Sequence, residues 1–149
     1  MALDIGERRI GLAISESGVL ATPYGVLERK SKAEDFIRLQ RIITEQKIDK
    51  LIIGLPYSLS AAQGVGPQAR RVMRYTEALA EKISIPFEYF DESYSTVDAR
   101  AYLVSSGRKK TPLDAAAAAV ILQNYLGVAG QHEPETQFKT GMSERNGER

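Results

Sequence analysis

Acidic side chains at three distant places in the chain are the groups best suited to chemistry. Asp4 lies in an apolar stretch near the start, Asp91 and Glu92 follow an apolar run, and Asp114 precedes five alanines. If the fold brings them together, they form a cluster of carboxylates without histidine or cysteine. Such an all-oxygen set favours Mg²⁺ or Mn²⁺ over zinc. Two such ions about 4 Å apart can activate water and stabilise the leaving oxygen of a phosphodiester.

Each of these acids also has an ordinary structural interpretation. Asp4 could begin a turn, as aspartate often does before glycine, or it could lie in a strand, where a buried carboxylate needs a partner, a proton or a metal. Asp91 and Glu92 could form an acidic turn before the next helix. Asp114 could satisfy amides at a helix N-terminus and interact with the helix dipole. Spacing alone leaves these alternatives open.

Composition restricts the chemistry further. The 149 residues suffice for one domain with a sizeable core. The chain has no cysteine, which excludes disulfides, thiolate zinc sites and cysteine nucleophiles and is typical of a cytoplasmic protein. The single histidine, His132, lies in a polar tail, where we expect it to be solvated. No apolar run approaches the roughly 20 residues that span a bilayer, and no secretory signal is visible, so no membrane partner is expected.

Basic residues occur in local clusters although the net charge is only +1. A solvated surface is the usual meaning of such a cluster. Several clusters on one face would instead form a surface that binds nucleic-acid phosphates. The clusters are Arg8/Arg9, Arg29/Lys30/Lys32, Arg70/Arg71/Arg74 and Arg108/Lys109/Lys110.

Hydrophobic periodicity predicts a three-stranded antiparallel meander followed by two α/β units. The capping-box spacing of Ser31 and Glu34 begins the first helix, Pro67 begins the second, and Thr111 is the expected N-cap of the last. The alanines after Asp114 indicate close backbone packing against the sheet. The expected elements are a hairpin over 2–14, strands over 18–27, 50–55 and 85–90, and helices from 31 to about 47, from 67, over 95–105, and from 111 to 126.

The last expected helix ends at Gly127. We therefore predict one domain over residues 1–127. Residues 128–149 are polar and aperiodic, so we predict a disordered tail there.

Five co-linear motifs make the chain recognisable. The segments are ALDIG at 2–6 with RIGLA at 9–13, IGLP at 53–56, GPQAR at 66–70, DE at 91–92 with ST at 95–96, and DAAA at 114–117 leading to ILQNYL at 121–126. In these segments the sequence resembles the YqgF or RuvX family, bacterial RNase H-like proteins described as Holliday junction resolvases or as nucleases that mature small-subunit ribosomal RNA. The motifs cover residues 2–126 in the family's order.

The resemblance implies an α/β, RNase H-like fold with a five-stranded mixed sheet flanked by helices. It implies a metal-dependent endonuclease, acting in 5′-end processing of pre-16S rRNA, in resolution of Holliday junctions, or in both. Asp4, Glu92 and Asp114 are then the catalytic and metal-binding carboxylates, with Asp91 as a supporting neighbour and two Mg²⁺ or Mn²⁺ ions as the expected cofactors. The partner is nucleic acid, held by Arg8, Arg9, Arg70, Arg71, Arg74, Arg108, Lys109 and Lys110, and the protein is a monomer or a homodimer.

Some positions depart from the family pattern. Ser93 and Tyr94 follow the acidic pair where the family usually has arginine, so a cation that could steady the acids is missing. The loop after Pro56 carries Tyr57 and Ser58 and looks longer than usual. Only three residues precede Asp4, so we expect a first strand that is short or trimmed at its start.

Two other functions compete with a nuclease. A non-catalytic nucleic-acid-binding or ribosome-assembly factor could keep the same fold with the acids as relics. Retention of all three carboxylates favours the nuclease. An actin-like ATPase shares the core fold and an Asp-x-Gly hairpin, but it needs a second domain that 149 residues do not provide.

Overall fold

The computed structural model describes residues 1–56, 65–91 and 111–131. The elements in these ranges are β1 (Ala2–Ile5), β2 (Arg9–Ile14), β3 (Thr22–Glu28), α1 (Lys32–Glu45), β4 (Leu51–Leu55), α2 (Pro67–Ala80), β5 (Phe87–Asp91) and α4 (Leu113–Gln131). The loop expected after Pro56, the helix expected over 95–105 and the tail from 132 onward lie outside the described residues.

The sheet has five strands in the order β3-β2-β1-β4-β5. The first three strands form the predicted antiparallel meander, and β4 and β5 add parallel strands beside β1. The first strand is thus the central one. It is short, as expected, and its hairpin closes where the Gly6 amide donates to the Arg9 carbonyl over 2.9 Å. The mixed five-stranded sheet predicted from the sequence is confirmed.

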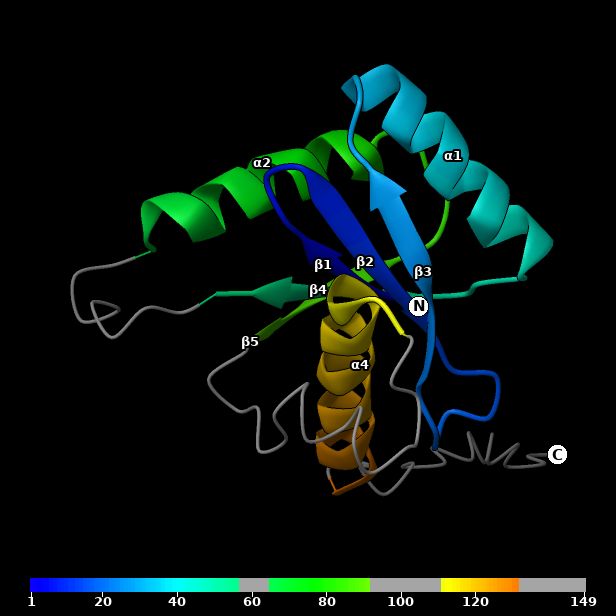
Figure 1. Cartoon of the computed structure of the whole chain (residues 1–149). Helices are drawn as coiled ribbons and strands as arrows, with labels where there is room; N and C mark the ends of the chain where they lie inside the picture. Colours follow the sequence, from blue (N-terminus) through cyan, green and yellow to red (C-terminus); the bar gives the residue numbers. More distant parts are fainter. Residues whose placement is uncertain (57–64, 92–110, 132–149) are drawn as a thin grey trace, which may run out of the picture.

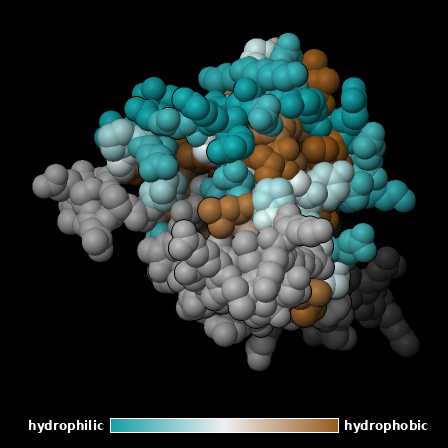
Figure 2. All heavy atoms as spheres, in the orientation of Figure 1, coloured by the Kyte–Doolittle hydropathy of each residue, from teal (hydrophilic) through white to brown (hydrophobic). Residues whose placement is uncertain are grey.

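Helices cover both faces of the sheet (Figure 1): α1 and α2 lie on one face and α4 on the other. The core on the α1/α2 face is built from large aliphatic side chains, among them the fully buried Leu3, Leu39, Ile53 and Leu79. In Figure 2 hydrophilic residues cover the outside of α1 and α2, with hydrophobic residues showing between them. Among the described helices, none combines the length and apolarity needed to cross a membrane.

Small residues form the contact between the sheet and α4. Ala2 and Ala13 are fully buried and pair directly across β1 and β2. Ala118 and Ala119 of α4 are also fully buried in the same cluster. Because these four side chains are small, the helix backbone approaches β1 and β2 closely here, while larger side chains complete the same cluster, among them Ile52, Phe90, Ile121 and Leu122. The close packing predicted from the alanine run is confirmed.

Helix starts agree closely with the sequence patterns. The Ser31 hydroxyl accepts a hydrogen bond from the Glu34 amide over 3.2 Å, as the capping-box spacing predicts. Pro67 is the first residue of α2. The last helix begins at Leu113, where the Pro112 carbonyl accepts from the Ala116 amide over 3.0 Å, one residue later than the predicted N-cap at Thr111 requires.

Three predicted boundaries were wrong. The segment before Thr22 is not strand, because Gly18 has a φ of 75° and the Ser17 hydroxyl accepts from the amides of Val19 and Leu20. The last strand extends through Asp91, which is paired with Leu55. Gly127 does not end α4, which continues to Gln131. A glycine inside a helix costs only about 1 kcal/mol relative to alanine, so the hydrogen-bonded turns around it can continue.

Candidate functional site

Asp4 lies inside the central strand, directly opposite Gly11 of β2. Side chains alternate between the two faces of a strand. Leu3 and Ile5 belong to the core under α1 and α2, whereas Ala2 belongs to the core under α4. Asp4 therefore faces α4, and the alternative in which it begins a turn is wrong.

Gly11 determines how close the last helix comes to Asp4. A Cβ at Gly11 would overlap the carbonyl oxygen of Asp114 and lie 2.5 Å from its carbonyl carbon. The first turn of α4 thus rests directly on the backbone of β2 beside the Asp4–Gly11 pair. A glycine inside a strand often marks such a close backbone approach, which is the sequence signal for this contact. The structure therefore brings Asp4 and Asp114 together.

The carboxylates of Asp4 and Asp114 are close enough to interact electrostatically. Burial raises the pKa of Asp4 from 3.8 to about 6, and the negative charge of Asp114 adds to this increase. Among the described residues, no donor forms a hydrogen bond or ion pair with the Asp4 carboxylate. An anion that is half-buried, unpaired and next to a second anion is a suitable ligand for a cation.

Arg9 is in direct contact with one of these two acids, Asp114. Its Nε lies 3.4 Å from Asp114 Oδ2, and the two side chains are 60% and 43% exposed. An exposed pair of this kind is weak, so it steadies Asp114 without neutralising the site. Arg9 was predicted to bind nucleic acid, and its contact with Asp114 was not foreseen.

The second pair of predicted acids, Asp91 and Glu92, does not join Asp4 and Asp114 within the described residues. Asp91 is the last residue of β5. Phe87 and Tyr89 of this strand belong to the core under α1 and α2, whereas Phe90 belongs to the core under α4. Because side chains alternate along a strand, Asp91 lies on the α1/α2 face. Asp91 is thus on the opposite face from Asp4. Glu92 lies outside the described residues. Within residues 1–56, 65–91 and 111–131, no group of three His, Cys, Asp or Glu side chains could hold a metal.

Several of the predicted basic residues lie near the edge of the sheet where β1 ends and β2 begins. Arg8 and Arg9 lie at the hairpin turn, and Arg71 of α2 reaches Glu7 of this turn at 3.2 Å. Arg70 donates from Nε to the Val65 carbonyl over 3.1 Å. Arg74 lines a pocket on the α1/α2 face together with Arg29 and Lys32, which the sequence showed only as a basic cluster. Arg108, Lys109 and Lys110 lie outside the described residues.

The donor set fits a hard divalent cation. Asp4 and Asp114 supply only carboxylate oxygens, which Mg²⁺ and Mn²⁺ prefer. Their repulsion, seen in the raised pKa of Asp4, would be relieved by a cation between them. The carboxyl end of a central parallel strand is also where ligands of α/β sheets collect.

Comparison with protein families and curated proteins shows which proteins this chain is similar to. Residues 1–128 match the family model described as RuvX, Holliday junction resolvase. A protein of Thermoanaerobacter pseudethanolicus named "Putative pre-16S rRNA nuclease" is 40% identical over 132 residues, covering 85% of this chain and 94% of the relative. A protein of Trichormus variabilis with the same name is 37% identical over 133 residues, covering 86% of this chain and 87% of the relative.

Solved structures show the same fold at low identity. The structure of T. thermophilus RuvC in complex with Holliday junction substrate matches with a TM-score of 0.63 and 11% identity, covering 87% of this chain and 93% of that one. A second Thermus thermophilus RuvC structure matches with a TM-score of 0.60, also at 11% identity and with the same coverage. The RNase H-like fold predicted from the sequence is confirmed.

Proposed function

The chain belongs to the RuvX family, and from this membership and the paired acids we propose that it is a metal-dependent nuclease that hydrolyses phosphodiester bonds. The observation that carries the proposal is the environment of Asp4. This carboxylate lies on the central strand, has no hydrogen-bond partner among the described residues, and is kept at a raised pKa by burial and by Asp114. A carboxylate in this environment destabilises the folded protein unless a cation binds it.

We assign Asp4, Asp114 and Glu92 as the ligands of Mg²⁺ or Mn²⁺, with two ions as the expected number. Asp91 is less suited to direct binding, because the alternation of β5 directs it to the other face of the sheet. Bound divalent ions lower the pKa of a water and neutralise the charge that develops on the phosphate. No histidine is needed for this step, because bound divalent ions themselves lower the pKa of the water.

The protein's own residues perform the remaining tasks. Asp4 is held rigidly in a strand that pairs on both sides. Asp114 is held by the contact between its backbone and Gly11 and by Arg9. These contacts fix the backbone positions of the two acids before any ion or substrate binds.

Basic residues bind phosphates of the nucleic acid on either side of the acids. Contacts of this kind position the strand without reading its sequence. The residues assigned to this task are Arg8, Arg70, Arg71 and Arg74, together with Arg108, Lys109 and Lys110.

The relatives suggest the substrate. The curated relatives are named for pre-16S rRNA, whereas the resolvase structure, at 11% identity, contains a Holliday junction. The higher identity favours 5′-end processing of pre-16S rRNA as the main activity. Junction cleavage is the second candidate, carried by the family description.

The decisive experiment compares the wild-type protein with Asp4→Asn and Asp114→Asn on both substrates, at matched salt and with Mg²⁺ or Mn²⁺. We expect both variants to lose cleavage, because asparagine keeps the shape of each side chain but removes the charge that the ions need. Calorimetric titration with Mn²⁺ should show weaker binding by both. Binding of RNA without metal should survive or improve in Asp4→Asn, since a negative charge facing phosphate is gone.

Glu45→Gln is the matched control, because Glu45 is exposed on α1, far along the chain from the acids. It should retain full activity. If Asp4→Asn and Asp114→Asn cleave as fast as the control, the nuclease site is wrong. If the wild-type protein binds RNA but neither binds Mn²⁺ nor cleaves, the non-catalytic alternative would be favoured.

A further inference from the structure

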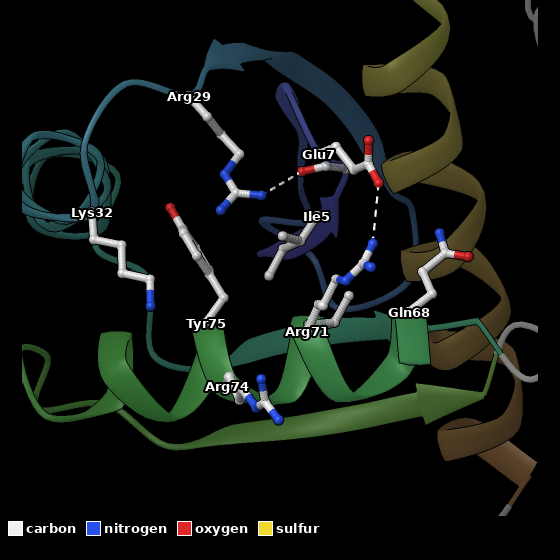
Figure 3. A pocket seen from close by; sticks show the side chains of 10 residues that line it. Ile5, Glu7, Arg29, Lys32, Gln68, Arg71, Arg74 and Tyr75 are labelled. Atoms are coloured by element: carbon white, nitrogen blue, oxygen red, sulfur yellow. Dashed lines mark hydrogen bonds and ion pairs between the residues drawn. The ribbon is translucent and has the colours of Figure 1, made fainter. Parts of the chain in front are cut away.

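A pocket on the α1/α2 face has no role in the proposed metal site. Its volume is about 240 Å³, and it lies between the β1–β2 turn, the start of α1 and one face of α2 (Figure 3). The residues that give it its character are Arg29, Lys32, Gln68, Arg71, Arg74 and Tyr75. Side chains from three separate segments thus meet around one hollow.

One of its guanidinium groups, that of Arg29, is held in a fixed position. Arg29 donates from Nη1 to the Gly6 carbonyl over 2.8 Å and lies 4.6 Å above the ring of Tyr75. The hydroxyl of Tyr75 in turn donates to the buried Asp35 over 3.1 Å. A cation held in this way loses less conformational entropy when it binds an anion. Arg71 forms an ion pair with Glu7 over 3.2 Å, as Figure 3 shows, but this pair is exposed and therefore weak.

The other two cations are uncommitted. In the part of the chain that the structure describes, Lys32 and Arg74 form no ion pair. The lining thus contains four cationic side chains and one carboxylate, that of Glu7. Guanidinium groups bind phosphate oxygens through paired N–H donors, and Gln68 adds a neutral donor. This combination suits a compact phosphate group better than an apolar ligand.

The pocket and the two acids lie on opposite faces of the sheet, at the end of the central strand. Ile5, Gly6 and Glu7 line the pocket, whereas Asp4, one residue earlier, faces α4 on the other side. A strand that crosses this edge of the sheet could therefore occupy both places.

We propose that this pocket binds a phosphate of the substrate strand a few nucleotides from the cleaved bond, and thereby determines which bond is cut. The proposal rests on the proposed nuclease function for its second half, the choice of bond. Its first half, phosphate binding, stands on the pocket alone. Arg29 and Lys32 are new assignments, and Asp35 is a positioning residue that acts through Tyr75.

The first test measures binding without divalent ions, using a short single-stranded RNA labelled with a fluorophore. The double variant Lys32→Gln/Arg74→Gln removes both uncommitted cations, and Arg41→Gln/Lys82→Gln removes the same charge from exposed residues outside the pocket. We expect affinity to fall about tenfold in the pocket variant and less than twofold in the control. The slope of log affinity against log salt should become shallower by about 0.7 for each phosphate that the variant no longer neutralises.

The second test maps the cut sites on the pre-16S rRNA 5′ region with Mn²⁺. The wild-type protein and the control should cut at one set of positions, whereas the pocket variant should cut at several neighbouring bonds. Equal affinity loss in the two variants, or none in the pocket variant, would overturn the phosphate site. Unchanged cut positions despite weaker binding would overturn its role in choosing the bond. If the wild-type protein cleaves nothing, the proposed function fails, while the binding measurement still decides whether the pocket holds phosphate.

Discussion

The carbonyl oxygen of Asp114 occupies the space in which a side chain at Gly11 would begin. Gly11 is also the residue that pairs with Asp4 across the central hairpin. One glycine therefore sets the height of α4 above the sheet and, through it, the separation of the two acids. The raised pKa of Asp4, to which Asp114 contributes, is the electrostatic consequence of this contact.

The first prediction is that Gly11→Ala destabilises the protein by about 1–3 kcal/mol, the usual cost of overpacking. The new methyl group would collide with helix backbone, which cannot rotate away as a side chain can. Urea unfolding measures the loss. Gly25→Ala is the matched control, because Gly25 also lies in a strand but a Cβ added there would meet nothing within 4 Å. Equal stability of the two variants would show that α4 does not rest on Gly11.

The second prediction concerns pH and the metal-free protein. Burial, with a contribution from Asp114, raises the pKa of Asp4 from 3.8 to about 6. Below about pH 4 Asp4 is protonated in both the folded and the unfolded state. Between about pH 4 and 6 the unfolded chain releases the proton first, so stability falls as pH rises, and above about pH 6 the full penalty applies. An increase of about two units corresponds to roughly 2–3 kcal/mol.

Asp4→Asn should therefore be more stable than the wild-type protein at about pH 7 and equally stable near pH 3.5. Urea unfolding of both proteins, with EDTA, at several pH values gives the difference directly. Glu45→Gln serves as the control, because it removes an exposed carboxylate of the same charge. A stability difference between wild type and Asp4→Asn that stays constant from about pH 4 to about pH 6 would contradict the raised pKa.

Local patterns in the sequence were sufficient for most of the fold. Apolar runs, the capping hydroxyl of Ser31 and the proline at position 67 are local signals, and the structure places strands and helix starts where they indicate. The strand order is not among these local signals: the position of β1 between β2 and β4, and hence the central place of Asp4, is a finding of the structure.

Contacts between distant residues could not be predicted in this way. The pairing of Arg71 with Glu7 joins positions 64 residues apart, and that of Tyr75 with Asp35 joins positions 40 apart. Neither contact has a local signal, because each depends on how α2 lies against other elements. Gly127 shows the opposite case, in which a local signal was present but wrong. The glycine predicted the end of the last helix, whereas α4 continues through it to Gln131.

A third prediction separates the two causes of the raised pKa of Asp4. Asp114→Asn removes the neighbouring negative charge but not the burial, which is the larger cause. The pKa of Asp4 should thus fall below 6 but stay above its ordinary value of 3.8. Carbon-13 NMR of the Asp4 carboxyl, titrated without metal, measures this. Stability should change little, because asparagine also satisfies amides at a helix N-terminus. A pKa unchanged by the substitution would show that the two acids are too far apart to share an ion.

The last prediction concerns the buried carboxylate that supports the phosphate pocket. Asp35 is 1% exposed. It accepts hydrogen bonds from the Lys30 amide over 2.9 Å, from Arg38 Nη2 over 2.8 Å and from the Tyr75 hydroxyl over 3.1 Å. Asp35→Ala leaves all three donors without their acceptor and removes the negative charge beside Arg38 and Arg29, which lies 4.0 Å away.

We expect Asp35→Ala to lose about 2–4 kcal/mol of unfolding free energy, because a broken buried ion pair leaves its partner uncompensated. Tyr75→Phe removes a single hydrogen bond and should lose about 1 kcal/mol. The double variant should lose less than the sum of the two, since both changes break the same contact. Urea unfolding of the wild-type protein, the two single variants and the double variant gives this double-mutant cycle. Fully additive losses would show that the Tyr75 hydroxyl and Asp35 do not interact, and Asp35 would then have no means of positioning the aromatic ring beneath Arg29.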